Sequence, residues 1–150
     1  MLIAQNNYSN SIILFVTLYR IFNLSISMRT LLKYDFCEVE VYDKYIVVVM
    51  FEGISLTPEK NDVLLGIATK YFTNSNFGYI THRIHSYSVD PSIYYETSKI
   101  ENLLAFAVVS SKQIDVTNTK LEKIFYKKPF QHFTELKDAI LWIENTVSKN

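Results

Sequence analysis

Apolar and polar residues alternate in one early segment of the chain, and the next segment is apolar throughout. Segment 36–42 places its cysteine and two valines on one face and its two glutamates on the other, which predicts a half-buried strand. Segment 45–51 is typical of a strand covered on both faces. Because only Asp43-Lys44 separates the two, we expect them to form an antiparallel hairpin.

Helix signals follow the hairpin. Thr57-Pro58-Glu59 combines a hydroxyl cap, a proline at the first helical position and a carboxylate near the positive end of the helix dipole. The residues after it form one apolar face at helical spacing: Val63, Leu64, Ile67, Ala68, Tyr71 and Phe72. Asp90-Pro91 predicts the start of a second, shorter helix that ends near Ile100.

Further apolar runs predict strands at 77–82, 103–109 and 130–133. Residues 117–126 are expected to form a helix with Leu121, Ile124 and Phe125 facing inward. Thr134 should cap a last helix. The expected inner face of that helix is Leu136, Ala139, Ile140, Ile143 and Val147, with Trp142 at its margin.

The order of these elements predicts the fold class. A hairpin followed by alternating helices and strands is typical of a single α/β domain. We expect a mostly parallel, mixed sheet of about five strands with about four helices. Apolar residues make up 49% of the chain and charged residues 20%, which indicates a globular domain. With three glycines and three prolines, the loops should be short and no flexible linker is expected.

The first 27 residues differ in composition from the rest. Residues 1–28 carry one charge, Arg20, and every acidic residue lies at Asp35 or later. The apolar run 12–18 is shorter than the roughly 20 residues that span a bilayer, so no stable membrane insertion is expected. We interpret residues 1–27 as a dispensable extension, disordered or upstream of the true start, before a domain at 28–150. A packed extra element and a membrane-leaning anchor are the alternatives.

The charges balance, with 15 basic and 15 acidic residues. No global field would therefore attract nucleic acid or an anionic membrane, and we expect no nucleic-acid partner. One local cluster consists of Lys120, Lys123, Lys127 and Lys128. We interpret it as a solvated helix face because Glu122 interrupts it.

The chain has a single cysteine, Cys37, so it cannot form an internal disulfide. Its position in an alternating strand predicts a small buried side chain. The cysteine content favours a reducing compartment, and we expect a cytoplasmic protein.

The densest group of polar side chains lies in segment 78–91, where a predicted strand ends in a loop. A metal site would need His82, His85 and Asp90 to converge, but histidines three apart in extended chain point to opposite faces. No Gly-x-Ser-x-Gly elbow and no glycine-rich phosphate loop occur. We therefore expect no catalytic residue, no metal site and no cofactor.

From Met28 onward the chain resembles the STAS / SpoIIAA-like family of bacterial anti-sigma-factor antagonists and transporter regulatory domains. The hairpin ending in Phe51-Glu-Gly53, the Thr57-Pro58 helix start and the segment Lys128–Trp142 carry the resemblance. The family's fold implies a regulatory role exerted through protein contacts. In that family a hydroxyl residue at a helix start is phosphorylated, and by position Ser86 or Ser88 would inherit this role. The family's following glycine is missing here, so we expect no regulated phosphorylation.

Our leading hypothesis is a non-catalytic module that binds another protein, with a second copy of the chain as one candidate. The expected surface is the 82–95 loop and helix start, with contributions from Arg83, Ser86, Tyr87, Ser88 and Tyr94. Replacing Arg83 or Tyr87 with alanine is expected to weaken partner binding with little loss of stability. The alternative is a small-molecule or lipid-binding domain, in which Tyr87, Tyr94 and Tyr95 line a cleft beside Arg83. A closed pocket would favour the ligand, and a flat or convex patch the partner.

Overall fold

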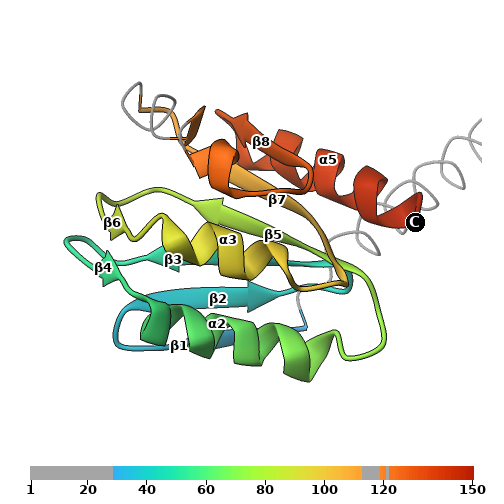
Figure 1. Ribbon diagram of the computed structural model, residues 1–150, viewed down its shortest axis with the longest axis horizontal. Helices are drawn as coiled ribbons and strands as arrows, with labels where there is room; N and C mark the ends of the chain where they lie inside the picture. Colours follow the sequence, from blue (N-terminus) through green and yellow to red (C-terminus); the bar gives the residue numbers. More distant parts are fainter. Residues whose placement is uncertain (1–28, 113–118, 121) are drawn as a thin grey trace, which may run out of the picture.

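The computed structural model describes residues 29–112, 119–120 and 122–150 (Figure 1). The extension predicted at 1–27 lies outside the described residues, as do Leu121 and the first two residues of the helix predicted at 117–126. Across the described parts of the chain, no helix has the length and apolar character needed to cross a membrane.

A six-stranded mixed sheet forms the centre of the domain. In spatial order its strands are β1 (Thr30–Lys33), β2 (Cys37–Val41), β3 (Tyr45–Met50), β5 (Phe77–His82), β7 (Leu103–Val109) and β8 (Phe130–Phe133). β1, β2 and β3 pair antiparallel, whereas β3, β5, β7 and β8 pair parallel. The predicted hairpin and the mixed α/β sheet are confirmed. The additional strand, β1, was missed because its sequence Thr-Leu-Leu-Lys neither alternates nor forms an apolar run.

Within the described residues, three helices and a shorter helical segment cover the sheet (Figure 1). They are α2 (Pro58–Tyr71), α3 (Ser92–Ser98), α5 (Leu136–Ser148) and the helical residues 119–120 and 122–125, here called the Glu122 helix. α2, α3 and Tyr126 pack in one apolar cluster with the face that carries Val39, Val48 and Phe106. α5 packs on the opposite face. The sheet therefore separates two apolar cores, one under α2 and α3 and the other under α5.

Two two-residue strands form a second, parallel sheet beside the first. They are β4 (Ser55–Leu56) and β6 (Ser88–Val89). Neither strand is long enough to produce a sequence pattern, and neither was predicted. Their pairing joins the loop after β3 to the loop after β5, which matters for the site described below.

The inner face of α2 differs from the predicted one. Val63 is 38% exposed, whereas Asn61 is only 6% exposed. The Asn61 amide donates a hydrogen bond to Thr97 Oγ1 of α3 at 3.3 Å, which compensates for the burial of a polar group. The prediction that Val63 faces inward is therefore wrong.

The predicted helix starts lie within one residue of the observed ones but differ in chemistry. Thr57 occupies the N-cap of α2, but its side chain makes no capping hydrogen bond. The N-cap of α5 is Glu135, one residue after the predicted Thr134. The N-cap of α3 is Pro91, and Asp90 lies just before it, where its carboxylate accepts a hydrogen bond from the Ser92 backbone N–H at 2.9 Å.

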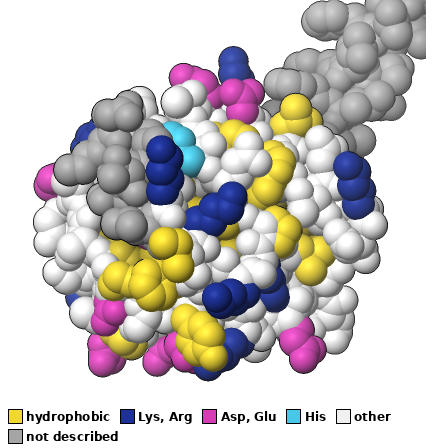
Figure 2. All heavy atoms as spheres, turned by 45° about the horizontal axis from the view of Figure 1, so that its top comes forward, with side chains coloured by type: hydrophobic (Ala, Val, Ile, Leu, Met, Phe, Trp, Pro, Cys, Tyr) yellow, Lys and Arg dark blue, Asp and Glu magenta, His cyan; other side chains and the backbone are white. Residues whose placement is uncertain are grey.

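The Glu122 helix is rotated relative to the prediction. Ile124 and Phe125, expected inside, are 65% and 43% exposed. Thr119, Glu122 and Tyr126 are buried instead, at a spacing that defines one helical face. Figure 2 shows apolar side chains at the surface on one side of the molecule. The prediction failed because it assigned the inner face to apolar residues, whereas the structure directs a carboxylate inward.

α5 follows its predicted pattern. Ala139, Ile143 and Val147 are buried against the sheet. Trp142 is half-buried at the margin of this face, where its ring lies 5.6 Å from that of Phe133.

The buried thiol of Cys37 offers a test of the core. Cys37 has no exposed surface, and burial, assisted by the charge of Asp35, raises the pKa of its thiol to about 12. Because the thiolate is the reactive form, the folded chain at about pH 8 should react with iodoacetamide far more slowly than the chain unfolded in urea. Mass spectrometry of the alkylated protein measures both rates. Equal rates would contradict this packing.

Candidate functional site

The carboxyl ends of β3, β5 and β7 lie at one edge of the sheet because these strands run parallel. The chain turns after β3 at Glu52-Gly53, where Gly53 has a φ of 73° that favours glycine. It enters the 83–91 loop after β5 and reaches Ser110 after β7. Ligands and partners of open α/β sheets dock at this edge.

Arg83 follows β5 and lies inside this edge. Its Nη2 donates to both Glu122 carboxylate oxygens, at 2.7 and 2.9 Å, and to the Tyr94 hydroxyl at 3.0 Å. Its Nε donates to the Tyr87 hydroxyl at 3.2 Å, and that hydroxyl also shares a hydrogen bond with Thr81 Oγ1 at 2.7 Å. One guanidinium thus ties the loop, α3 and the Glu122 helix to the end of β5.

The charges in this network are balanced inside the protein. Burial alone would lower the pKa of Arg83, but the Tyr87 and Tyr94 hydroxyls and the Glu122 carboxylate raise it, so that the net shift is upward. Burial also raises the pKa of the Tyr94 phenol well above its ordinary value, although the Arg83 charge opposes this. Near neutral pH the guanidinium therefore stays charged and the Tyr94 phenol keeps its proton. These groups suit a structural role better than proton transfer.

The tip of the loop is exposed and held at several points. Ile84 is 54% exposed. The Ser86 N–H donates to Glu52 Oε2 at 2.9 Å, and the Ser86 carbonyl accepts from the Gly53 N–H at 2.8 Å. Lys112 Nζ donates to the Ser86 hydroxyl at 3.1 Å. The tip therefore presents an apolar side chain beside one acidic and one basic residue.

β6 fixes the far end of the loop. The Ser88 N–H donates to the Ile54 carbonyl at 2.9 Å, and the Ser88 hydroxyl bonds to Ser55 Oγ at 3.0 Å. The Asp90 N–H donates to the Leu56 carbonyl at 3.2 Å. Backbone hydrogen bonds thus hold the loop on both sides of its tip.

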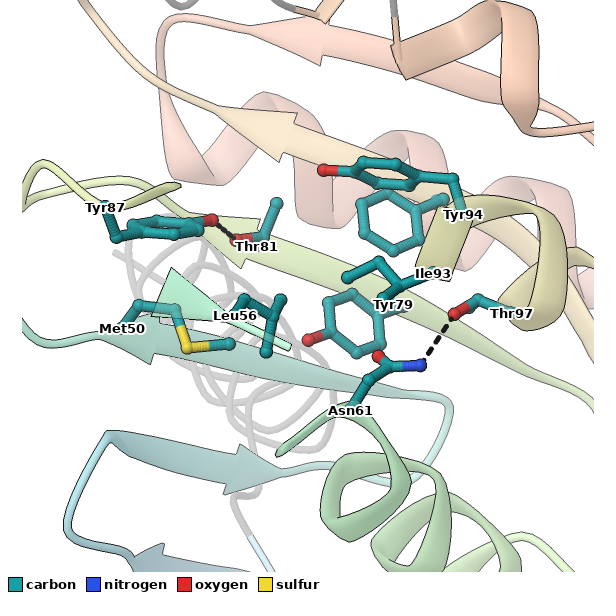
Figure 3. A pocket seen from close by; sticks show the side chains of 10 residues that line it. Met50, Leu56, Asn61, Tyr79, Thr81, Tyr87, Ile93, Tyr94 and Thr97 are labelled. Carbon is teal, nitrogen blue, oxygen red and sulfur yellow. Dashed lines mark hydrogen bonds between the residues drawn. The ribbon is translucent and has the colours of Figure 1, made fainter. Parts of the chain in front are cut away.

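The space behind the loop is small. A cavity of about 10 Å³ lies between α2, α3 and the sheet, and Tyr79, Thr81, Tyr87 and Tyr94 are among its lining residues (Figure 3). A single water molecule needs roughly 10–15 Å³ of such space. The cavity therefore accommodates about one water molecule, not a lipid or a drug-sized ligand.

The predicted site residues fall into two groups. Arg83 and Tyr94 are buried, at 7% and 3% exposure, and Tyr87 is half-buried, whereas Ser86 and Ser88 are exposed. The burial of Arg83 contradicts the expectation that its replacement would cost little stability.

Sequence reasoning missed four residues that shape the site. They are Ile84 at the tip, Glu52 and Lys112 beside it, and Glu122 beneath it. The one available signal was an apolar Ile84 in a polar loop. The other three are distant in sequence and are brought together only by the fold.

The two histidines near this edge, His82 and His85, differ in burial. His82 is the last residue of β5, and burial lowers the pKa of its imidazole, opposed by the charge of Glu40. His85 is exposed, with Nδ1 3.8 Å from Glu52 Oε2. Across the residues that the structure describes, no three His, Cys, Asp or Glu side chains gather as a metal site would require.

Comparison with solved structures finds a neighbour of low sequence identity. No protein-family model and no curated protein matches the chain. The structure is similar to that of an uncharacterised protein of the DUF3478 family from Shewanella loihica PV-4, described as having a SpoIIAA-like fold. The two share 10% sequence identity, and the match covers 76% of this chain and 90% of that one, with a TM-score of 0.47.

Proposed function

We propose that the chain is a non-catalytic regulatory module that acts by binding another protein through the tip of the 82–95 segment. The contact surface consists of Ile84, Ser86 and Ser88, with Glu52 and Lys112 at its rim. Arg83, Tyr87 and Tyr94 hold this surface in place from below.

The observation that carries this proposal is the contrast between the surface and the space behind it. Ile84 is 54% exposed on a hydrogen-bonded loop, while the cavity beneath holds only about 10 Å³. An apolar contact with a polar rim is typical of protein interfaces. A loop that is already ordered loses little conformational entropy on binding, which favours association.

The small cavity also argues against the alternative, a small-molecule or lipid-binding domain. A small-molecule or lipid site needs a pocket of roughly 300–1,000 Å³ with a few converging polar groups. Of the three tyrosines expected to line such a pocket, Tyr87 and Tyr94 accept hydrogen bonds from Arg83, and Tyr95 is 49% exposed.

The proposed contact is constitutive and cytoplasmic. The Ser86 hydroxyl is already bonded to Lys112, and Ser88 of β6 pairs with Ser55 of β4, so neither serine needs a phosphate to order the loop. A single buried cysteine suits a reducing compartment.

Photo-crosslinking tests the proposal. A photoreactive phenylalanine analogue placed at position 84, in the organism that encodes the protein, should crosslink to a second protein or to another copy of the chain. The same analogue at Leu141, which is 60% exposed on α5, is the matched control and should give little product. Absent crosslinks at 84, or equal yields at both positions, would refute the proposed surface.

A further inference from the structure

β8 is an outer strand of the six-stranded sheet. The Phe106 N–H of β7 donates to the Pro129 carbonyl at 3.0 Å, and the Ser110 N–H donates to the Phe133 carbonyl at 2.9 Å. Successive residues of a strand direct their backbone groups to opposite sides. This register therefore turns the N–H and carbonyl groups of His132 away from β7. Among the strands that the structure describes, none pairs with that side.

A groove of about 230 Å³ lies between this edge and the Glu122 helix. It is lined by Thr119, Lys120, Lys123, Phe130, Gln131 and His132. The His132 Nε2 atom is buried and has no hydrogen-bond partner among the described residues. Because this atom is enclosed by the protein, a group bound in the groove would not reach it, and the outward backbone N–H and carbonyl of His132 are what the edge offers to a bound chain.

The groove is basic because the neighbouring carboxylate, Glu122, is buried inside the protein. Glu122, which interrupts the lysine cluster in the sequence, points inward to Arg83. Lys128 also points inward, donating to the backbone carbonyls of Ile100 and Leu103.

Lys120 and Lys123 remain exposed at the groove, and no carboxylate in the described part of the chain pairs with either. Figure 2 turns the top of Figure 1 forward and shows several Lys and Arg side chains on that face. The lysine cluster was interpreted from the sequence as a solvated helix face because Glu122 interrupts it. Glu122 is buried, so it does not neutralise the lysines at the surface.

We propose that the groove along β8 binds an extended acidic segment of a partner protein, which adds a strand to the edge of the sheet. The outward backbone groups supply the pairing, as in other cases of strand addition. Lys120 and Lys123 attract acidic side chains and set the preference for charge. A concave groove beside a strand edge suits an extended chain better than a flat membrane. Pairing along the four residues of β8 spans roughly 13 Å.

This surface shares no residue with the loop surface around Ile84, and the two proposals can fail separately. The Ile84→Asp variant should bind the acidic segment as the wild-type chain does.

Two fluorescein-labelled peptides test the proposal on the full chain at low salt. Both alternate valine with a charged residue, glutamate in one and lysine in the other. Fluorescence anisotropy should show binding of the glutamate peptide alone. The double variant Lys120→Glu, Lys123→Glu should weaken it by about tenfold or more.

A proline at His132 separates strand addition from simple charge attraction. His132→Pro removes an outward N–H without removing a hydrogen bond to β7. It should weaken the binding of the glutamate peptide by roughly tenfold. The control His132→Val keeps the N–H and should bind like the wild type. Far-UV circular dichroism confirms that each variant is folded.

Three results would overturn the proposal. They are no binding of the glutamate peptide, equal binding of both peptides, and undiminished binding by a folded His132→Pro variant. Tight binding to phosphatidylserine vesicles that is indifferent to His132→Pro, with no peptide binding, would assign the lysines to a membrane surface instead.

Discussion

Replacing Glu122 with alanine is expected to lower the free energy of unfolding by about 3–5 kcal/mol. The Glu122 and Arg83 side chains are 11% and 5% exposed, and the carboxylate accepts two hydrogen bonds from the guanidinium. Removing it leaves a buried positive charge without this counter-charge, and water cannot easily replace it. Urea unfolding at neutral pH, followed by far-UV circular dichroism, measures the loss.

Two further variants distinguish the ion pair from general damage to the helix. Lys123 lies on the same helix and is exposed. Lys123→Ala should therefore change the free energy of unfolding by less than about 0.5 kcal/mol. The double variant Arg83→Met, Glu122→Leu should recover most of the stability, because apolar residues of similar volume often replace a buried ion pair without loss. A loss below about 1 kcal/mol for Glu122→Ala would contradict the described burial.

Replacing Gly78 with alanine is expected to destabilise the protein by about 2–3 kcal/mol. Gly78 lies on β5 where α5 crosses the sheet, and a Cβ there would lie 2.3 Å from Ile143 Cγ2 and 2.8 Å from Ile143 Cδ1. Both distances are far inside van der Waals contact, so the helix or the strand must shift. Urea unfolding measures the effect as above.

Gly66 provides the matched control for this overpacking. It lies in α2, and a Cβ there would meet nothing within 4 Å. Gly66→Ala should therefore stabilise the protein by roughly 0.5–1 kcal/mol, since alanine favours a helix over glycine. Combining Gly78→Ala with Ile143→Ala should cost less than the sum of the single variants, because each relieves the other. A neutral Gly78→Ala would contradict the close packing of α5 on β5.

The sequence predicts the central elements of this fold because their patterns are strong. The alternation in 36–42 and the apolar runs at 45–51 and 103–109 identify three strands of the sheet. The face of α5 was likewise predicted, because its buried residues are apolar and helically spaced. By contrast, the sequence of β1 neither alternates nor forms an apolar run, and the two-residue strands β4 and β6 are too short for a period to show.

The candidate site was located by sequence but not resolved into its parts. The loop after β5 was identified because polar residues follow a strand. Which of them lie inside depends on Arg83 and Glu122, which are 39 residues apart and pair only in the fold. The same pairing reversed the inner face of the Glu122 helix, because a buried carboxylate breaks the rule that apolar residues face inward. Periodicity cannot reveal a buried ion pair between distant segments.

The central claim is that the exposed loop tip around Ile84 binds a protein and that the space behind it holds no organic ligand. Native mass spectrometry of the protein purified from the organism that encodes it tests both halves together. We predict a complex with a second protein or another copy of the chain, which Ile84→Asp dissociates and Leu141→Asp leaves intact. A monomer carrying the constant extra mass of a small organic molecule, unchanged by Ile84→Asp, would contradict the claim.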